Sequence, residues 1–195
     1  RLAKVTRVVF DKTGTLTHGK PEVVAIHPFA SGMTTGELLG LAATIEQRSE
    51  HPLGKAILRH AKSLGAAPKS VEQSTAVPGR GVSVSFDGKQ ALGGTLQLML
   101  DNGICPSDEI LKTVEEYKES GSTVIFIGID NSVAGIIVLA DTLRSDAGIT
   151  VKRLHREGVW TTLLTGDNAQ AANSIAAAVG IDEVKAELLP EDKVN

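Results

Sequence analysis

Residues 8–17 read Val-Val-Phe-Asp-Lys-Thr-Gly-Thr-Leu-Thr, and this stretch decides how the rest of the chain is interpreted. The apolar run over residues 5–10 predicts a buried β-strand that ends at Asp11, with residues 12–15 following as a loop. Such a strand places its terminal carboxylate at the carboxyl edge of a parallel sheet, where open α/β sheets bind ligands. Because a carboxylate can attack a phosphoryl group, the stretch predicts a phosphorylation site at Asp11.

The residues that follow Asp11 suit a phosphate group. Gly14 lets backbone amides approach phosphate oxygens closely, and Lys12 brings positive charge near the reacting group. The hydroxyls of Thr13 and Thr15 add hydrogen-bond donors. The alternative interpretation is structural: Asp11 caps a turn that Gly14 serves, which an arbitrary Asp-x-x-Gly sequence would favour.

The composition restricts the classes of function. The 195 residues are 42% hydrophobic and 22% charged, as in a soluble globular protein, and the net charge of −3 gives no reason to expect a nucleic-acid partner. Cys105 is the one cysteine, so no intrachain disulfide can form. No apolar run reaches the roughly 18 residues of a membrane-spanning helix. The chain has no starting Met and no signal-peptide core, so we expect it to be cut from a longer protein.

The periodicity of the sequence divides the chain into two parts. Helices over 144–157 and 168–179 alternate with strands over 159–164 and 184–186, an order that predicts a parallel sheet shared with the first strand. The middle of the chain instead predicts an antiparallel α+β unit. Its expected helices span 34–47, 52–64, 95–101 and 107–119, and its expected strands span 21–26, 71–77, 82–86, 90–92, 124–129 and 133–139. Asp87-Gly88 and Asp130-Asn131 are expected to form the turns of two hairpins.

These elements predict one unit inserted into another. The α/β unit comprises residues 1–19 and 132–195, and the antiparallel unit comprises residues 20–131. The insertion point lies just after Asp11, so the expected fold is a parallel-sheet domain that carries an inserted α+β domain.

Residues 11–15 match, one for one, the Asp-Lys-Thr-Gly-Thr signature of P-type ATPases, and the chain resembles this family. Its phosphorylation domain has the haloacid-dehalogenase-like fold, which the resemblance implies for the α/β unit here, truncated at its C-terminus. Simple phosphatases of this fold carry a second Asp two residues after the nucleophile as general acid/base. Position 13 is Thr here, so the resemblance implies a persistent aspartyl-phosphate at Asp11 rather than immediate hydrolysis.

Three further segments resemble P-type ATPase motifs. Thr165, Gly166 and Asp167 resemble the Thr-Gly-Asp motif, whose hydroxyl and amide suit a phosphate oxygen; Asp167 could orient a neighbour or cap the next helix. Residues 141–144 resemble the Asp-x-x-Arg hinge motif, although spacing alone would allow a charge at a helix N-terminus. The Leu-Pro-x-x-Lys segment that ends at Lys193 implies a lysine that reaches the transferred phosphoryl group.

The resemblance also implies Mg²⁺, held by the Asp11 carboxylate and the Thr13 carbonyl. The family's other Mg²⁺ carboxylate belongs to a Gly-Asp-Gly-x-Asn-Asp motif that is absent from this sequence. We expect this motif beyond residue 195, so the isolated chain is expected to be poorly active.

The inserted unit carries motifs of the heavy-metal-transporting branch, which imply that it binds ATP. The Ser-Glu-His-Pro-Leu sequence around His51 matches a branch motif whose His contacts adenine, although a helix-capping turn is the simpler interpretation. Gly79 and Gly81 match glycines that let the nucleotide approach the backbone, or they serve a turn between strands. Glu46 matches an acidic position that helps to hold adenine. Residues 92–95 lack the Asn that many branch members carry, so we expect no nucleotide contact there.

As implied by the resemblance, the chain is the cytoplasmic domain of an integral membrane protein. Its partners would be ATP and the membrane helices and actuator domain of the same full-length protein. The transported heavy-metal cation would bind those helices and not this chain, whose histidines show no ligand spacing. The sequence of residues 186–190 resembles that of zinc, cadmium or cobalt exporters slightly more than that of copper exporters.

Two alternatives remain open from the sequence alone. One is a soluble phosphatase of the same fold in which the inserted unit forms a cap; Thr13 argues against it. The other is a nucleotide-binding module with no chemistry of its own, which the missing Mg²⁺ motif favours for the isolated chain.

Overall fold

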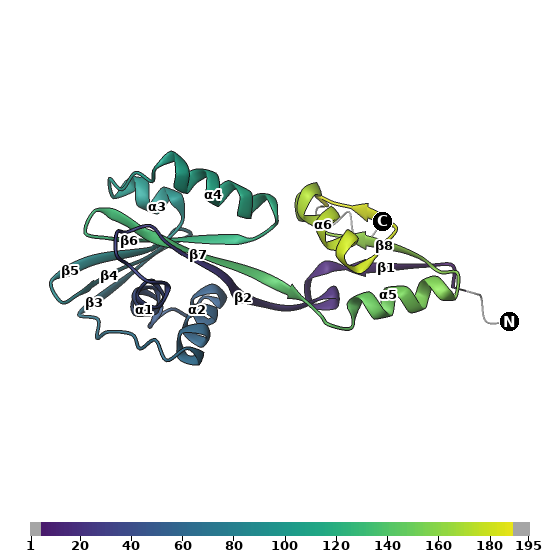
Figure 1. The fold of residues 1–195 in the computed structure, drawn as a ribbon, viewed down its shortest axis with the longest axis horizontal. Helices are drawn as coiled ribbons and strands as arrows, with labels where there is room; N and C mark the ends of the chain where they lie inside the picture. The colour runs from purple at the N-terminus through teal and green to yellow at the C-terminus, as the bar shows by residue number, and fades with distance from the viewer. Residues whose placement is uncertain (1–4, 189–195) are drawn as a thin grey trace. The chain divides into compact units, whose positions relative to one another are not determined.

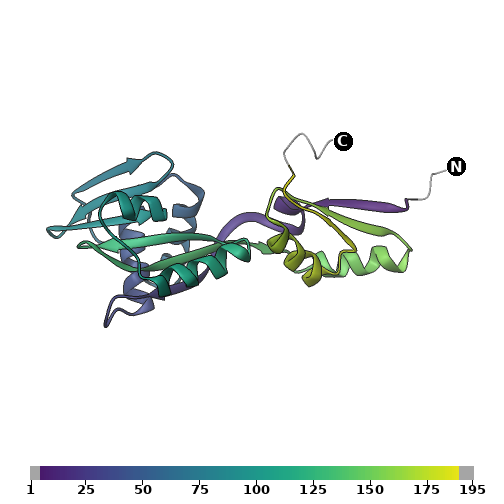
Figure 2. The ribbon, with the colours of Figure 1, turned by 90° about the horizontal axis from the view of Figure 1, so that it is seen from above.

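The computed structural model describes residues 5–188, which form two compact units (Figures 1 and 2). Within the described residues, the first unit comprises residues 5–20, 119–121 and 141–188, and the second comprises residues 21–118 and 122–140. The sequence predicts residues 20–131 as an inserted nucleotide-binding domain, and both these limits and this function stay a prediction.

The first unit is built on a parallel sheet, as the alternation of strands and helices predicted. Its strands are β1 (Arg7–Asp11), β8 (Trp160–Leu164) and β9 (Glu183–Lys185), in the order β1-β8-β9. In the β1–β8 register, Asp11 lies opposite Leu164, so the two strands end at the same edge of the sheet.

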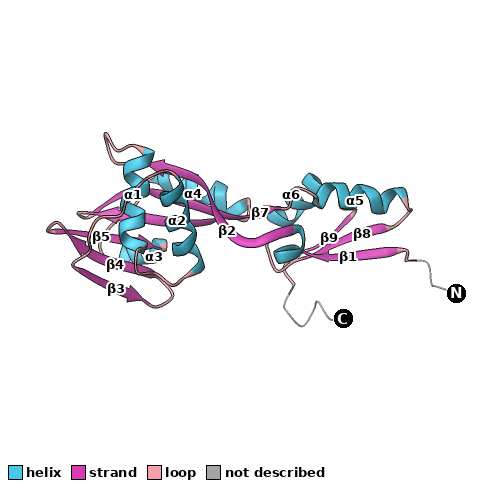
Figure 3. Cartoon of the chain, turned by 90° about the horizontal axis from the view of Figure 1, so that it is seen from below, coloured by secondary structure: helices cyan, strands magenta, loops and turns pink. Residues whose placement is uncertain are grey.

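Helices α5 (Ala147–Arg156) and α6 (Ala169–Val179) supply the core of this unit with the sheet (Figure 3). Buried aliphatic and aromatic side chains fill the space between them: Phe10, Leu16, Ala147, Val151, Leu163, Ala172, Ala176 and Val179. Helix α6 begins after Asn168, whose Oδ1 accepts a hydrogen bond from the Ala171 amide, and ends at Gly180 in the left-handed conformation. Helix α5 starts three residues later than predicted, because a turn precedes it, in which the Ala147 amide donates to the Arg144 carbonyl at 3.1 Å.

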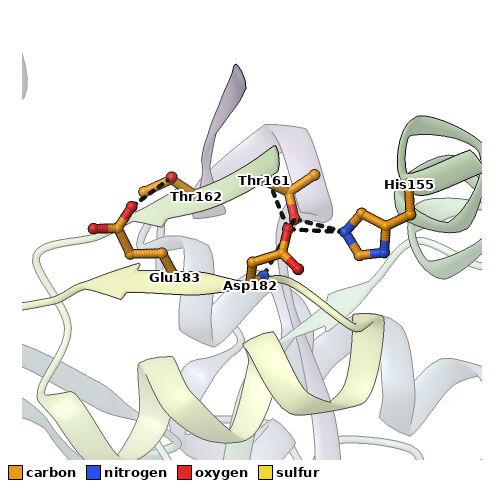
Figure 4. Close-up of polar contacts among 5 residues, drawn as sticks. All are labelled: His155, Thr161, Thr162, Asp182 and Glu183. Carbon is orange, nitrogen blue, oxygen red and sulfur yellow. Dashed lines mark hydrogen bonds and ion pairs between the residues drawn. The ribbon is translucent and has the colours of Figure 1, made fainter. Parts of the chain in front are cut away.

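A polar cluster fixes the amino edge of the parallel sheet (Figure 4). Asp182, just before β9, accepts hydrogen bonds from the amide and hydroxyl of Thr161, both at 2.8 Å, and lies 3.0 Å from His155 Nε2. These contacts, the Thr161 amide first, lower the pKa of the Asp182 carboxyl. Thr162 donates to Glu183 at 2.9 Å, so two side-chain bridges join β8 to the start of β9.

The second unit contains a mostly antiparallel six-stranded sheet, in the order β2-β7-β6-β5-β4-β3. Strands β2 and β7 extend beyond the expected strands over 21–26 and 133–139. The strands are β2 (Thr17–Pro28), β3 (Gln73–Val77), β4 (Gly81–Phe86), β5 (Lys89–Gly94), β6 (Thr123–Ile129) and β7 (Ser132–Leu143).

Two predicted hairpins are confirmed by their turn geometry. Asp87 and Gly88 join β4 to β5 with φ values of 50° and 70°, and Asp130 and Asn131 join β6 to β7 with 48° and 64°. Positive φ at both central residues is the requirement of a type I′ turn, which Asp, Asn and Gly meet most readily.

Helices cover both faces of this sheet (Figure 1). On one face, α1 (Thr35–Glu46) and α2 (Pro52–Ser63) pack against β-strand residues such as Ile127. On the other face, α3 (Leu96–Asp101) and α4 (Asp108–Glu119) pack against Phe126, which precedes Ile127 in β6. Successive side chains of β6 thus point to opposite faces of the sheet, and helices bury both faces. None of the helices within residues 5–188 is long and apolar enough to cross a bilayer.

Gly135 in β7 provides a test of this packing. A Cβ added there would lie 2.5 Å from the His27 carbonyl oxygen and would overlap the Leu38 side chain of α1. We expect Gly135→Ala to lower the free energy of unfolding by about 1–3 kcal/mol, measured by urea denaturation. Gly36→Ala is the matched control: it lies in α1 with no heavy atom within 4 Å of the added Cβ, and the change should be neutral or slightly stabilising. Equal effects of the two changes would contradict this packing.

Candidate functional site

The carboxyl ends of β1 and β8 bring together the two segments predicted to bind phosphate. Asp11 ends β1 and is exposed to solvent, and Leu164, opposite it in β8, is followed directly by Thr165. The predicted nucleophile is therefore accessible and is not packed inside the protein. The second segment, Thr165 to Asp167, forms the turn between β8 and α6.

An ion pair connects these two segments. Lys12 Nζ pairs with Asp167 Oδ2, and their side chains are 14% and 30% exposed. The cap of α6 is Asn168, so the predicted alternative that Asp167 caps this helix is wrong. Asp167 instead pairs with Lys12, the residue that follows Asp11, in a half-buried position where charge is screened less than at the surface.

Thr165 and Gly166 are held by the segment that follows β9. Thr165 is 2% exposed, its amide donates to the Lys185 carbonyl at 3.1 Å, and its hydroxyl accepts from the Asp167 amide at 3.1 Å. The amide of Glu187 donates to the Asp167 carbonyl at 2.9 Å from a left-handed conformation, with φ of 58°. No pattern in the sequence marks Glu187 as part of this site. Lys193 lies outside the described residues.

A buried threonine fixes the turn after Asp11. The Thr17 hydroxyl lies 2.5 Å from Asp141 Oδ2 and accepts a hydrogen bond from the Gly14 amide at 3.3 Å. Thr17 is 0% exposed, and Asp141 also accepts from the Lys20 amide at 3.3 Å. Asp141 belongs to β7, so the alternative of a charge at a helix N-terminus is wrong. No local pattern marks this role of Thr17, because its partner lies 124 residues away.

A second candidate site is a cavity of about 590 Å³ in the antiparallel unit. Pockets of this size accommodate a small-molecule ligand. The four residues predicted to bind nucleotide, Glu46, His51, Gly79 and Gly81, all line it.

The connection between α1 and α2 forms one side of this cavity. Glu46 is 5% exposed, and burial raises the pKa of its carboxyl, an effect that Ser49 and His51 partly offset. A Cβ at Gly54 would lie 2.6 Å from Ser49 Oγ, so only glycine fits beneath this pair. His51 Nδ1 accepts from the Leu53 amide at 3.2 Å, which assigns the proton of the neutral ring to Nε2. His51 is thus the helix cap that the simpler interpretation proposed, and it lines the cavity as well.

Bare backbone forms another side of the cavity. Gly79 and Gly81 have φ values of 69° and 147°, and a Cβ at Gly81 would lie 2.7 Å from Gly94 Cα. A Cβ at Gly93 would lie 2.8 Å from the Ile45 side chain. Gly93 and Gly94 also line the cavity, and the absence of nucleotide contacts from residues 92–95 stays a prediction.

A family model and known proteins match the chain over nearly its whole length. The model of the family described as haloacid dehalogenase-like hydrolase matches residues 5–195. The chain belongs to this family. This haloacid dehalogenase-like domain is 43% identical over 195 residues to the zinc/cadmium/lead-transporting P-type ATPase of Escherichia coli, covering 100% of the domain and 26% of that protein. It is 39% identical over 193 residues to the copper-exporting P-type ATPase of Staphylococcus aureus, covering 99% and 23%. The domain therefore spans about a quarter of the length of these relatives.

Solved structures agree with these sequence relatives. The crystal structure of a zinc-transporting PIB-type ATPase in the E2.Pi state matches with a TM-score of 0.87 and 44% identity, over 99% of this domain and 31% of that chain. The N-domain of a copper-transporting P-type ATPase matches with a TM-score of 0.52 and 26% identity, over 62% of this domain and 98% of that chain. The predicted fold class and the resemblance to heavy-metal P-type ATPases are confirmed.

The raised pKa of Glu46 predicts a pH-dependent stability. The folded domain binds a proton at Glu46 more readily than the unfolded chain does, so this residue lowers stability as the pH rises through the raised pKa. We expect Glu46→Gln to raise the free energy of unfolding by about 1 kcal/mol near pH 8, with the gain disappearing toward about pH 4. Urea denaturation across this range measures it. Glu50→Gln, at the exposed neighbouring glutamate, is the control, and a pH-independent difference for Glu46→Gln would contradict the assignment.

Proposed function

We propose that this domain is the ATP-using part of a heavy-metal-transporting P-type ATPase, in which the γ-phosphate of ATP is transferred to Asp11. One observation carries the proposal: Asp11 is exposed at the end of β1, beside the Thr165–Asp167 turn to which Lys12 is ion-paired. A carboxylate nucleophile, a cation and a phosphate-binding turn thus occupy one edge of one sheet.

In the proposed reaction, an Asp11 carboxylate oxygen attacks the γ-phosphorus in line with the bond to the bridging oxygen. That bond breaks, ADP leaves with the electron pair, and a mixed anhydride remains on Asp11. Lys12 supplies positive charge to the transferring group, and the Thr165 hydroxyl and Gly166 amide are the proposed donors to its oxygens. Thr13 cannot act as a general base, so the aspartyl-phosphate persists.

The residues around Asp11 fit a magnesium site with few protein ligands. Residues 5–188 assemble no group of three or more Asp, Glu, His or Cys side chains, and nearby Asp167 and Asp141 are held by Lys12 and Thr17. Mg²⁺ commonly uses one or two carboxylates together with phosphates and water, so the Asp11 carboxylate and the Thr13 carbonyl are suitable ligands. Bound Mg²⁺ would neutralise charge on the transferring phosphoryl group.

The cavity of the antiparallel unit is the proposed ATP site. Glu46 and His51 Nε2 offer an acceptor and a donor to the edge of adenine, and Gly79 and Gly81 expose backbone for close approach. The enclosing walls are largely apolar, as in most nucleotide pockets.

The remaining parts of the proposed pump lie outside this domain. Its relatives are named as zinc/cadmium/lead-transporting and copper-exporting P-type ATPases. In the proposed function, the complete protein moves such a cation through membrane helices, and an actuator domain completes the cycle. The domain would then face the cytoplasm. A capped soluble phosphatase of this fold is the weaker candidate, since residue 13 is Thr.

Replacement of the nucleophile tests the proposed chemistry. We expect Asp11→Asn in the complete protein to abolish the acid-stable phosphoenzyme formed from ATP labelled at the γ-phosphate, because an amide cannot form the acyl phosphate. Asp130→Asn makes the same chemical change in the β6–β7 turn and should leave labelling unchanged. Full labelling of Asp11→Asn would refute the proposal. Rapid hydrolysis of p-nitrophenyl phosphate by the wild-type domain would favour the phosphatase.

Two replacements of His51 separate nucleotide binding from helix capping. His51→Asn keeps a capping acceptor for the Leu53 amide, whereas His51→Ala removes it and should cost about 1 kcal/mol of stability. We expect both to weaken ATP binding to the domain about fivefold, because both remove the ring. Calorimetric titration with ATP and thermal unfolding measure the two effects. Unchanged ATP affinity in His51→Asn would remove His51 from the site.

A further inference from the structure

Arg80 occupies a rigid turn at the wall of the nucleotide cavity. Its amide donates to the Val77 carbonyl at 3.0 Å, and its carbonyl accepts from the Thr95 amide at 2.8 Å. The close approach of Gly81 to Gly94 fixes the same turn from the other side. Arg80 lines the cavity, so its backbone position there is set whether or not a ligand is bound.

The guanidinium of Arg80 is paired with a carboxylate from another element. Arg80 Nη1 forms an ion pair with Asp101, at the end of α3. The side chains are 44% and 39% exposed, and ion pairs in such positions contribute little to stability. A stronger anion can therefore compete for this guanidinium without disrupting the fold.

The charges around the cavity differ between its walls. Glu46 and Glu50 come from the connection between α1 and α2, and their carboxyl groups disfavour a polyphosphate there. Arg48, from the same connection, donates to the Val71 carbonyl at 3.4 Å. Arg80 comes from the β3–β4 turn, and Arg binds phosphate oxygens with paired, charge-assisted hydrogen bonds.

We propose that Arg80 binds the phosphate groups of the nucleotide, and that Asp101 occupies the guanidinium until these phosphates displace it. This inference rests on the proposed ATP site and adds a residue that distinguishes nucleotides by their phosphates. Glu46 and His51 would read the base, whereas Arg80 reads the charged end of the same ligand. No atom of the base is required for the Arg80 contact.

A phosphate series tests this division of roles. Adenosine, AMP and ATP are titrated into the 195-residue domain, and their dissociation constants are measured by NMR chemical-shift perturbation. We expect Arg80→Gln to weaken ATP binding about tenfold and to leave adenosine binding within about 1.5-fold of wild type. Arg80→Lys should recover part of the ATP affinity, because charge remains while the paired geometry is lost.

Replacement of Asp101 should have the opposite effect on ATP affinity. Asp101→Asn removes the competing carboxylate, so we expect ATP affinity to rise about two- to threefold with adenosine unchanged. The exposed pair between Lys69 and Asp87, 2.9 Å apart in the same unit and away from this cavity, is the matched control. Lys69→Gln and Asp87→Asn repeat the charge changes and should leave the ATP affinity unchanged.

The outcomes distinguish this inference from the proposed function. Wild-type ATP affinity in Arg80→Gln overturns the phosphate role of Arg80 and leaves the ATP site standing. Equal losses for adenosine and ATP also overturn it, because Arg80 would then shape the cavity rather than bind phosphate. Failure of the wild-type domain to bind either ligand overturns the ATP site itself, and the inference with it.

Discussion

Parallel pairing of β1 with β8 is the constraint on which the candidate active site depends. The register that places Asp11 opposite Leu164 sets the nucleophile beside the Thr165–Asp167 turn, and the Lys12–Asp167 ion pair extends this contact beyond the last paired residues. The two strands are separated in the chain by the entire antiparallel unit. Their pairing must overcome the entropy of closing that long connection, which grows only slowly with length. A folded insertion is therefore compatible with a fixed active-site edge.

Glycines have a comparable role in the cavity of the second unit. Gly54, Gly81 and Gly93 each occupy a position where a Cβ would overlap a neighbouring atom, and all three line the cavity. At Gly81 the backbone meets another backbone segment, and at Gly54 and Gly93 it meets neighbouring side chains, at distances that only glycine permits. The lining is thus determined by close approach of backbone segments as well as by side chains, and a cavity formed in this way is preformed before ligand binding.

Local patterns in the sequence predicted most elements of the fold, because strands, helices and hairpin turns have local signals. The Asp87-Gly88 and Asp130-Asn131 turns are examples. Contacts between distant residues gave no such signal: the Thr17–Asp141 hydrogen bond joins residues 124 positions apart. The left-handed conformation of Glu187 was equally hidden, since glutamate does not favour positive φ. For the candidate site, residue types were predictable from family motifs, whereas their supporting contacts required the structure.

The ion pair between Lys12 and Asp167 also bears on how the phosphoryl group would be received. A lysine beside a nucleophilic carboxylate could pair with Asp11 and lower its reactivity by stabilising its charge. The ion pair with Asp167 holds the Lys12 ammonium at the turn between β8 and α6, beside the end of β1 that carries Asp11. A phosphoryl group arriving at Asp11 adds negative charge, and a half-buried ammonium already in place meets that charge without further reorganisation. Because Asn168 caps α6, Asp167 does not cap this helix, and its carboxylate pairs with Lys12.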